Sequence, residues 1–155
     1  MFYLSQRSKN RLRGVHPDLV AVVRRALQIS ERDFSVAEGL RSEERQRQLF
    51  NAGKSQTMNS RHLTGHAVDL FPYPTNGDVD ADGVLSIHDW DEYYPQADAM
   101  LKASKELNVP LRWGGNWKVA DVRYWEGDAK ELHRAYRGSF PDGPHWEISR
   151  GYGYD

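Results

Sequence analysis

The sequence contains no cysteine among its 155 residues. This excludes a disulfide-stapled scaffold, a cysteine nucleophile and any metal site built from thiolates. An apolar core must therefore stabilise the fold, and a single domain spanning residues 1–155 would bury roughly two-thirds of its unfolded surface. Any metal ion must be bound by imidazole and carboxylate groups, for which six histidines are available.

Charge and hydropathy argue against two classes of partner. Lys and Arg number 21 and Asp and Glu number 22, so the formal net charge is −1, which disfavours a protein that coats nucleic acid. No stretch approaches the roughly 18–20 apolar residues that cross a bilayer, so we expect no stable membrane insertion. The chain turns polar after its first four residues, MFYL, so we expect no signal peptide and synthesis in the cytoplasm.

Short segments with regular patterns predict an α+β domain. Three segments have the start signals or apolar spacing of helices: Pro17 to about residue 27, Ser42 to just before Gly53, and residues 95–107 with Pro95 in the first turn. Four segments are predicted strands: 34–39, 66–71, 111–115 and 145–149. Because strands and helices are mixed without regular alternation, we expect a small antiparallel sheet flanked by helices.

Two stretches concentrate residue types that bind metals. SRHLTGHAVD (60–69) contains His62 and Asp69, and DGPHWE (142–147) contains His145. Two imidazoles and one carboxylate form a common catalytic zinc site with a fourth position open for water. On residue types alone, an isolated histidine is more often a hydrogen-bonded core or surface residue, and Asp69 could simply end a strand.

Three separate motifs, taken in order, resemble a family of zinc peptidases. The pattern S-x-H-x-x-G-x-A-x-D is followed far downstream by an acid three residues before H-x-E. EGLRSEERQ (38–46) and LRWGGNW (111–117) are similar to two further segments of the family. These enzymes cut peptidoglycan stem peptides and include VanX- and VanY-type D-alanyl-D-alanine peptidases and phage L-alanyl-D-glutamate endopeptidases. The resemblance implies the fold that they share with the hedgehog signalling domain.

The resemblance also implies catalytic roles. It implies three zinc ligands: His62, Asp69 and His145. Asp142 would be the general base and Arg41 would face the substrate carbonyl, where a cation stabilises developing negative charge. Asp142 stands where some members have Glu, so Gly143 and Pro144 would have to bring its shorter side chain near the metal. Without the zinc motifs, P-D-G-P would be an ordinary turn.

Further side chains have two interpretations each. The resemblance implies that Gln46 contacts substrate, and Ser60 and Arg61 are further candidates for substrate contact because they flank His62. Gln46 could equally be an exposed helix residue, and the other two could be surface residues. We expect His66 to line a pocket or the surface, and Glu147 either to hold the His145 imidazole or to face solvent. Three tryptophans are expected in the core or in a groove wall: Trp113, Trp117 and Trp146.

An acidic segment fits the calcium-loop template. Its proposed Ca²⁺ ligands are the carboxylates and one carbonyl of Asp78, Asp80, Asp82, Val84 and Asp89. The twelfth position is Asp rather than the usual Glu, and PYPTNG cannot form the usual entering helix. The alternative is an acidic surface insertion without a metal.

Together with these features, the resemblance implies a zinc-dependent phage endolysin that cleaves the L-alanyl-D-glutamate bond of peptidoglycan stem peptides. We expect a monomeric, single catalytic domain without a separate cell-wall-binding domain. After release by a holin it would act on periplasmic peptidoglycan. Two alternatives stay open: a D-alanyl-D-alanine carboxypeptidase and a non-catalytic, metal-stabilised cell-wall-binding module.

Overall fold

The computed structural model describes residues 1–74, 85–86 and 88–152. Among these residues, four strands form one antiparallel sheet in the order β1-β2-β4-β3, which confirms the predicted small antiparallel sheet. The strands are β1 (Phe34–Glu38), β2 (Ala67–Pro72), β4 (His145–Ile148) and β3 (Leu111–Trp113). Each agrees with its predicted segment to within two residues.

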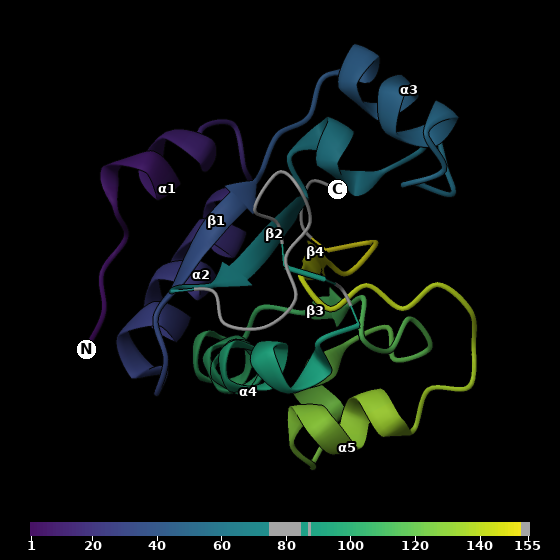
Figure 1. Cartoon of the computed structure of the whole chain (residues 1–155). Helices are drawn as coiled ribbons and strands as arrows, with labels where there is room; N and C mark the ends of the chain where they lie inside the picture. Colours follow the sequence, from purple (N-terminus) through teal and green to yellow (C-terminus); the bar gives the residue numbers. More distant parts are fainter. Residues whose placement is uncertain (75–84, 87, 153–155) are drawn as a thin grey trace.

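Helices surround the sheet (Figure 1). They are α1 (Gln6–Arg11), α2 (Pro17–Ile29), α3 (Glu43–Asn51), α4 (Trp90–Leu107) and α5 (Ala129–Arg134), with short 3-10 helices η1 (Arg61–Thr64) and η2 (Val122–Tyr124). The helices α2 and α4 pack against each other, and α4 also contacts β2. The core therefore lies between these two helices and one face of the sheet.

Alternation along the strands gives the sheet an apolar face and a polar face. Val68 of β2 and Trp146 of β4 are fully buried in the core. Their neighbours Asp69 and His145 face the opposite side, because successive side chains of a strand alternate. Burial of a large apolar side chain contributes roughly 1.5–3 kcal/mol, so a one-residue slip that turned Asp69 inward would be strongly unfavourable. The core thus fixes the register of the polar face.

Two helices begin where the sequence predicts. Helix α2 begins at Pro17, and the Nδ1 atom of the N-cap residue His16 accepts a hydrogen bond from the Asp18 N–H at 3.1 Å. Helix α3 follows Ser42, whose Oγ accepts from the Arg45 N–H at 3.1 Å. Both caps satisfy backbone donors that have no partner within the helix.

Helix α4 begins earlier than the sequence predicts. It starts at Trp90, so Pro95 lies inside the helix rather than in its first turn. Trp90 and Tyr93 are three residues apart and both pack inward: Tyr93 is fully buried and the Trp90 ring lies 6.2 Å from that of Trp113. This packing stabilises the additional turn although Pro95 cannot donate a backbone hydrogen bond.

Helix α1 is one of the elements that apolar spacing does not predict. It covers the free edge of β1, where the Val36 N–H donates to Ser8 Oγ at 3.0 Å and Arg11 Nη1 donates to the Val36 carbonyl at 3.0 Å. An exposed strand edge would otherwise be open to pairing with another chain. Its sequence signal is polar and local, which explains why periodicity misses it.

The structure tests the predictions about membrane insertion and calcium binding only for the residues that it describes. Within the described part of the chain, no helix is long and apolar enough to span a membrane. Four of the predicted calcium ligands, Asp78, Asp80, Asp82 and Val84, lie outside the described residues. Asp89 is described and is the N-cap residue of α4.

Gly65 connects η1 to the turn between α1 and α2. It adopts φ 76°, a left-handed conformation that favours glycine, and its carbonyl accepts from the His16 N–H at 2.8 Å. A Cβ atom at this position would lie 2.2 Å from the Gly14 carbonyl oxygen. The close approach sets the position of η1, which contains His62.

We predict that Gly65→Ala destabilises the protein more than Gly53→Ala. Gly53 also has a left-handed φ of 74°, but a Cβ atom there meets nothing within 4 Å. The control should lose about 1–2 kcal/mol of unfolding free energy for the backbone conformation, and Gly65→Ala should lose more because of the added clash. Urea unfolding measures both; equal losses would contradict the prediction.

Candidate metal centre

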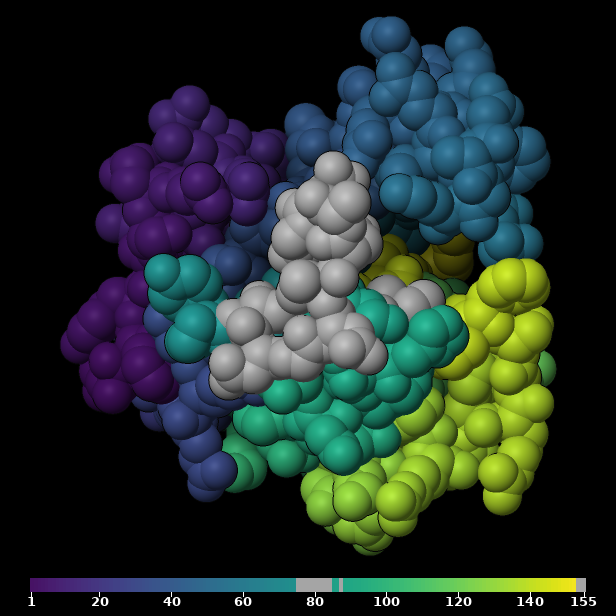
Figure 2. Space-filling model, viewed as in Figure 1, coloured from purple at the N-terminus to yellow at the C-terminus, as the bar shows by residue number. Residues whose placement is uncertain are grey.

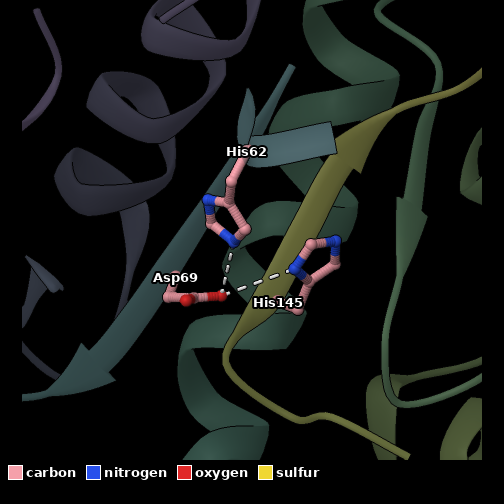
Figure 3. Close-up of side chains that lie close together, drawn as sticks. All are labelled: His62, Asp69 and His145. Carbon is pink, nitrogen blue, oxygen red and sulfur yellow. Dashed lines mark hydrogen bonds and ion pairs between the residues drawn. The ribbon is translucent and has the colours of Figure 1, made fainter. Parts of the chain in front are cut away.

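Three elements bring His62, Asp69 and His145 together on the polar face of the sheet. His62 comes from η1, Asp69 from β2 and His145 from β4, and one ligand atom from each lies within 4.8 Å of the other two. Figure 3 shows both imidazoles pointing at the Asp69 carboxylate. The distances to Asp69 Oδ1 are 3.2 Å from His62 Nε2 and 3.5 Å from His145 Nδ1.

These separations suit a tetrahedral zinc ion. Zinc binds imidazole nitrogen and carboxylate oxygen at about 2.0–2.2 Å, which places neighbouring ligand atoms roughly 3.4 Å apart. Asp69 and His145 are direct partners in the antiparallel register of β2 and β4. Side chains opposite each other in such a pair point to the same side and lie close together. The donor set therefore fits the metal that the sequence suggests.

Hydrogen bonds orient both imidazoles toward the centre. The Gly39 carbonyl lies 2.8 Å from His62 Nδ1 and can only accept, so Nδ1 donates and Nε2 is left to face Asp69. The Nε2 atom of His145 is 2.8 Å from Glu147 Oε1, which leaves Nδ1 for the centre. Partners of this kind fix the tautomer and orientation of metal-binding histidines. Glu147 is buried and holds the imidazole, which agrees with the first of its two interpretations.

The electrostatics match a site prepared for a cation. Burial alone would raise the pKa of Asp69, but the adjacent imidazoles of His62 and His145 hold it far below its usual value. Burial would lower the pKa of His145, but its hydrogen bonds to Asp69 and Glu147 raise it to about 10. Without metal, His145 therefore holds a proton at neutral pH that a metal ion would displace.

Arg41 contacts the candidate centre by an ion pair with Asp69. Its Nη2 is 3.4 Å from Asp69 Oδ2, the oxygen that does not face the imidazoles. Glu38 accepts from Nε and Nη2, each at 2.8 Å, and Gln46 Oε1 accepts from Nη1 at 2.7 Å. The Arg41 side chain is only 8% exposed. It is thus fixed beside the carboxylate rather than extended into solvent.

The three residues predicted to contact substrate have other partners in the structure. Gln46 is fully buried, and its Nε2 donates to Ser55 Oγ at 2.7 Å and to the Thr57 carbonyl at 2.6 Å. Ser60 caps η1, with its Oγ accepting from the His62 N–H at 3.2 Å. Arg61 is buried and donates to a carbonyl of β4 at 3.0 Å. Gln46 and Arg61 thus hold the protein together around the centre instead of presenting free groups to substrate.

Asp142 lies beside the centre on the segment that leads into β4. Its N–H donates to the Gly114 carbonyl at 2.7 Å and its carbonyl accepts from the His145 N–H at 3.2 Å. Burial and the charge of Asp69 raise the pKa of its carboxyl to about 6, against the opposing effect of the nearby cations. A carboxyl with such a pKa is ionised at neutral pH and can exchange a proton with a reacting group.

The tryptophans occupy two environments. Trp113 and Trp146 are fully buried and stack with ring centroids 5.4 Å apart. Trp117 is partly exposed, and its ring lies 5.2 Å from that of His145. His66 is not part of the centre: its Nδ1 lies 2.7 Å from Thr64 Oγ1.

One face of the molecule is hollowed beside α3. Figure 2 shows a depression between the blue segment around α3 and the yellow segment near residue 140. A cavity of about 510 Å³ lies beside Arg41 and is lined by Leu40, Arg41, Ser42, Glu43 and Leu63. None of the three clustered side chains lines this cavity, so we assign the chemistry to the cluster and not to the cavity.

Sequence reasoning did not single out Glu38, Gly39 or Gly114. Glu38 and Gly39 begin the EGLRSEERQ segment, and their roles are to hold Arg41 and to orient His62. Gly114 belongs to the LRWGGNW segment and receives the Asp142 N–H. Both motifs were visible, but only the tertiary structure assigns these contacts to their members.

Comparisons of the sequence and the structure with known proteins all find L-alanyl-D-glutamate peptidases. Residues 1–149 match the family described as phage L-alanyl-D-glutamate peptidase. The chain is 32% identical over 150 residues to the L-alanyl-D-glutamate peptidase of Escherichia phage T5, covering 95% of this chain and 98% of that protein. It is 28% identical to the peptidase of the same name from Listeria phage A118, of which it covers 45%. The crystal structure of the Serratia marcescens L-Ala D-Glu endopeptidase ChiX is similar with a TM-score of 0.69 and 42% identity, covering 95% of this chain and 90% of that one.

We predict that zinc binding to the metal-free protein at pH 8 releases at least one proton, because the proton lost by His145 adds to any proton lost by a zinc-bound water. The pKa of His145 is raised to about 10, so its imidazole is protonated at pH 8, whereas a zinc ligand must be unprotonated. Affinity should therefore fall as the pH is lowered. Isothermal titration in two buffers of different ionisation enthalpy measures the release.

The matched control is His88→Gln, because His88 is exposed and lies outside the cluster. It should release the same number of protons as the wild type. Zinc binding without proton release, or with affinity that does not change with pH, would contradict the prediction.

Proposed function

The chain belongs to the phage L-alanyl-D-glutamate peptidase family, and from this premise we propose that it is a zinc-dependent peptidoglycan hydrolase that cleaves the L-alanyl-D-glutamate bond of stem peptides. The observation that supports this most strongly is the convergence of three side chains on one point: His62, Asp69 and His145. Three protein ligands leave a fourth zinc position for water or substrate, the arrangement of catalytic sites.

A zinc ion at this site would act as a Lewis acid toward both water and the substrate carbonyl. Zinc held by these residues would lower the pKa of a coordinated water from 15.7 to about 7 and polarise the scissile carbonyl. The residues contribute orientation: Gly39 and Glu147 hold the two imidazoles, and Arg41 holds the outer oxygen of Asp69. A ligand set fixed in this way loses little entropy when the metal binds.

Asp142 would act as the general base. It would accept a proton from the attacking water and return it to the leaving amine of D-glutamate. In the metal-free protein, burial and the charge of Asp69 raise the pKa of this carboxyl to about 6, so it is ionised at neutral pH and can accept a proton. Asp142 would therefore return the proton that it accepted, and no second acid is needed to protonate the leaving amine.

Arg41 would contribute a single donor to the substrate carbonyl. A guanidinium has five N–H groups, and the contacts with Glu38, Gln46 and Asp69 use four of them. Among the described residues, one Nη1 hydrogen has no such contact. That hydrogen could stabilise the developing oxyanion, and loss of such a donor typically costs about 100–1,000-fold in rate.

We propose that the protein works as a monomeric, single catalytic domain made in the host cytoplasm. Release by a holin would bring it to periplasmic peptidoglycan, its substrate. A D-alanyl-D-alanine carboxypeptidase would need a free cation for the terminal carboxylate, whereas Arg41 and Arg61 are both engaged within the protein. The relatives' names also favour the endopeptidase.

Digestion of purified muropeptides tests this function, and Asp142→Asn is the matched control. The wild type should produce a new free amine on D-glutamate, and Asp142→Asn should bind zinc but lose about 100–10,000-fold in kcat, because only the proton acceptor is removed. Mass spectrometry of the products identifies the bond. Release of D-alanine would instead support the carboxypeptidase, and inert protein that still binds zinc would support the binding module.

We also propose that the acidic segment binds Ca²⁺ through Asp78, Asp80, Asp82, Asp89 and the Val84 carbonyl. A ligand that binds only the folded state stabilises it, so calcium at a hundredfold excess over Kd should raise Tm by about 5–10 °C. Differential scanning calorimetry with calcium and with a calcium-selective chelator measures the shift. Asp78→Asn should abolish it, and equal Tm values for the wild type would overturn the proposal.

A further inference from the structure

The segment that contains Asp142 is held by the neighbouring segment 113–117. Trp113 Nε1 donates to the Gly143 carbonyl at 2.7 Å, and Trp117 Nε1 donates to the Phe140 carbonyl at 2.8 Å. Between these two bonds, the Asp142 N–H donates to the Gly114 carbonyl at 2.7 Å. Two indole groups and one backbone carbonyl thus hold the chain on both sides of Asp142.

The backbones of the two segments are in direct contact. A Cβ atom on Gly114 would lie 2.2 Å from the Asp142 carbonyl oxygen and 2.9 Å from Asp142 Cβ. Phe140 adopts a left-handed φ of 55°, which a residue other than glycine adopts at a cost. The hydrogen bond from Trp117 acts at this strained residue. The loop is therefore held in a conformation that it would not favour on its own.

The same segment is also fixed to the metal centre. The Gly114 N–H donates to the His145 carbonyl at 2.9 Å, and the Trp117 ring lies 5.2 Å from the His145 imidazole. Arg112 steadies Trp117, since its Nε donates to the Trp117 carbonyl at 2.9 Å and its guanidinium carbon lies 4.9 Å from the ring centroid. Segment 113–117 thus sets the position of Asp142 relative to a ligand.

Because the aspartate side chain is short, the backbone at Asp142 must be held in place for its carboxylate to act as a general base. An ionised carboxylate in a partly buried position gains free energy by moving toward water, and Asp142 sits on a loop that would otherwise allow that movement. A base must come within about 2.6–3.2 Å of the proton it accepts, and an error of about 1 Å can cost on the order of 100-fold in rate.

We propose, on the basis of the function proposed above, that Trp117 is a positioning residue for Asp142. Its indole N–H fixes the Phe140 carbonyl and thereby keeps the Asp142 carboxylate within reach of the attacking water. Trp113 makes the equivalent bond on the other side but is fully buried in the core, so its substitution would also affect stability. Trp117 is partly exposed and separates the two effects.

Trp117→Phe is the direct test, because it removes the N–H and keeps an aromatic ring. We expect kcat for muropeptide hydrolysis to fall about 10- to 100-fold, with KM, zinc affinity and Tm close to those of the wild type. The control is Trp125→Phe, since Trp125 Nε1 also donates to a carbonyl, that of Asp128 at 3.1 Å, but in the turn before α5. The control should keep full kcat.

A double-mutant cycle with Asp142→Asn distinguishes positioning from a general structural effect. If Trp117 acts through Asp142, Trp117→Phe should change kcat by less than about twofold in the Asp142→Asn background. The same fold-loss in both backgrounds, or full kcat in the single variant, would overturn the proposal. If the single variant does not fold, Trp117→Tyr replaces it, since it also lacks the indole N–H that donates to the Phe140 carbonyl and should show the same coupling.

Failure of this inference differs from failure of the proposed function. Wild-type protein that does not hydrolyse muropeptides would refute the function itself. Active wild-type protein whose kcat is insensitive to Trp117→Phe would refute only the positioning role.

Discussion

The pairing of Asp69 with His145 across β2 and β4 is the constraint on which the rest of the centre depends. The same strands bury Val68 and Trp146 on the other face, so one strand register positions both the core and the candidate metal centre. A shift of one residue in the pairing of β2 with β4 would disrupt both the core packing and the pairing of Asp69 with His145. The left-handed Gly65 then brings η1, and with it His62, to the same side. The geometry of the candidate centre is thus a consequence of apolar packing.

Charge is concentrated around this pair and is balanced locally. Asp69 has imidazoles at one oxygen and Arg41 at the other, and Glu38 balances Arg41 in turn. Glu147 is buried beside His145. Burial would raise the pKa of Glu147, but its hydrogen bond to His145 and the charges of Arg112 and Arg61 lower it below the usual value. An unpaired buried charge would be costly, so removal of one member of this network affects the others. The network thus holds the side chains of the candidate metal centre in place.

The sequence was sufficient for the parts of the fold that depend on local patterns. Short apolar segments predict the strands, Pro17 predicts the start of α2 as a first helical residue, and Ser42 predicts the start of α3. It did not predict that α4 begins at Trp90, because the extra turn depends on packing of Trp90 and Tyr93 against distant residues. Motif order brought His62, Asp69 and His145 into one hypothesis, and the structure places these side chains together. Motifs did not reveal that Gln46 and Arg61 point inward, because burial depends on what packs above them.

The most direct measurement is anomalous diffraction at the zinc absorption edge from crystals of the protein prepared with zinc. The account predicts one strong peak about 2.0–2.2 Å from His62 Nε2, Asp69 Oδ1 and His145 Nδ1, with a fourth ligand that does not come from the protein. A peak coordinated by other residues, or no ordered zinc between these three side chains, would contradict it.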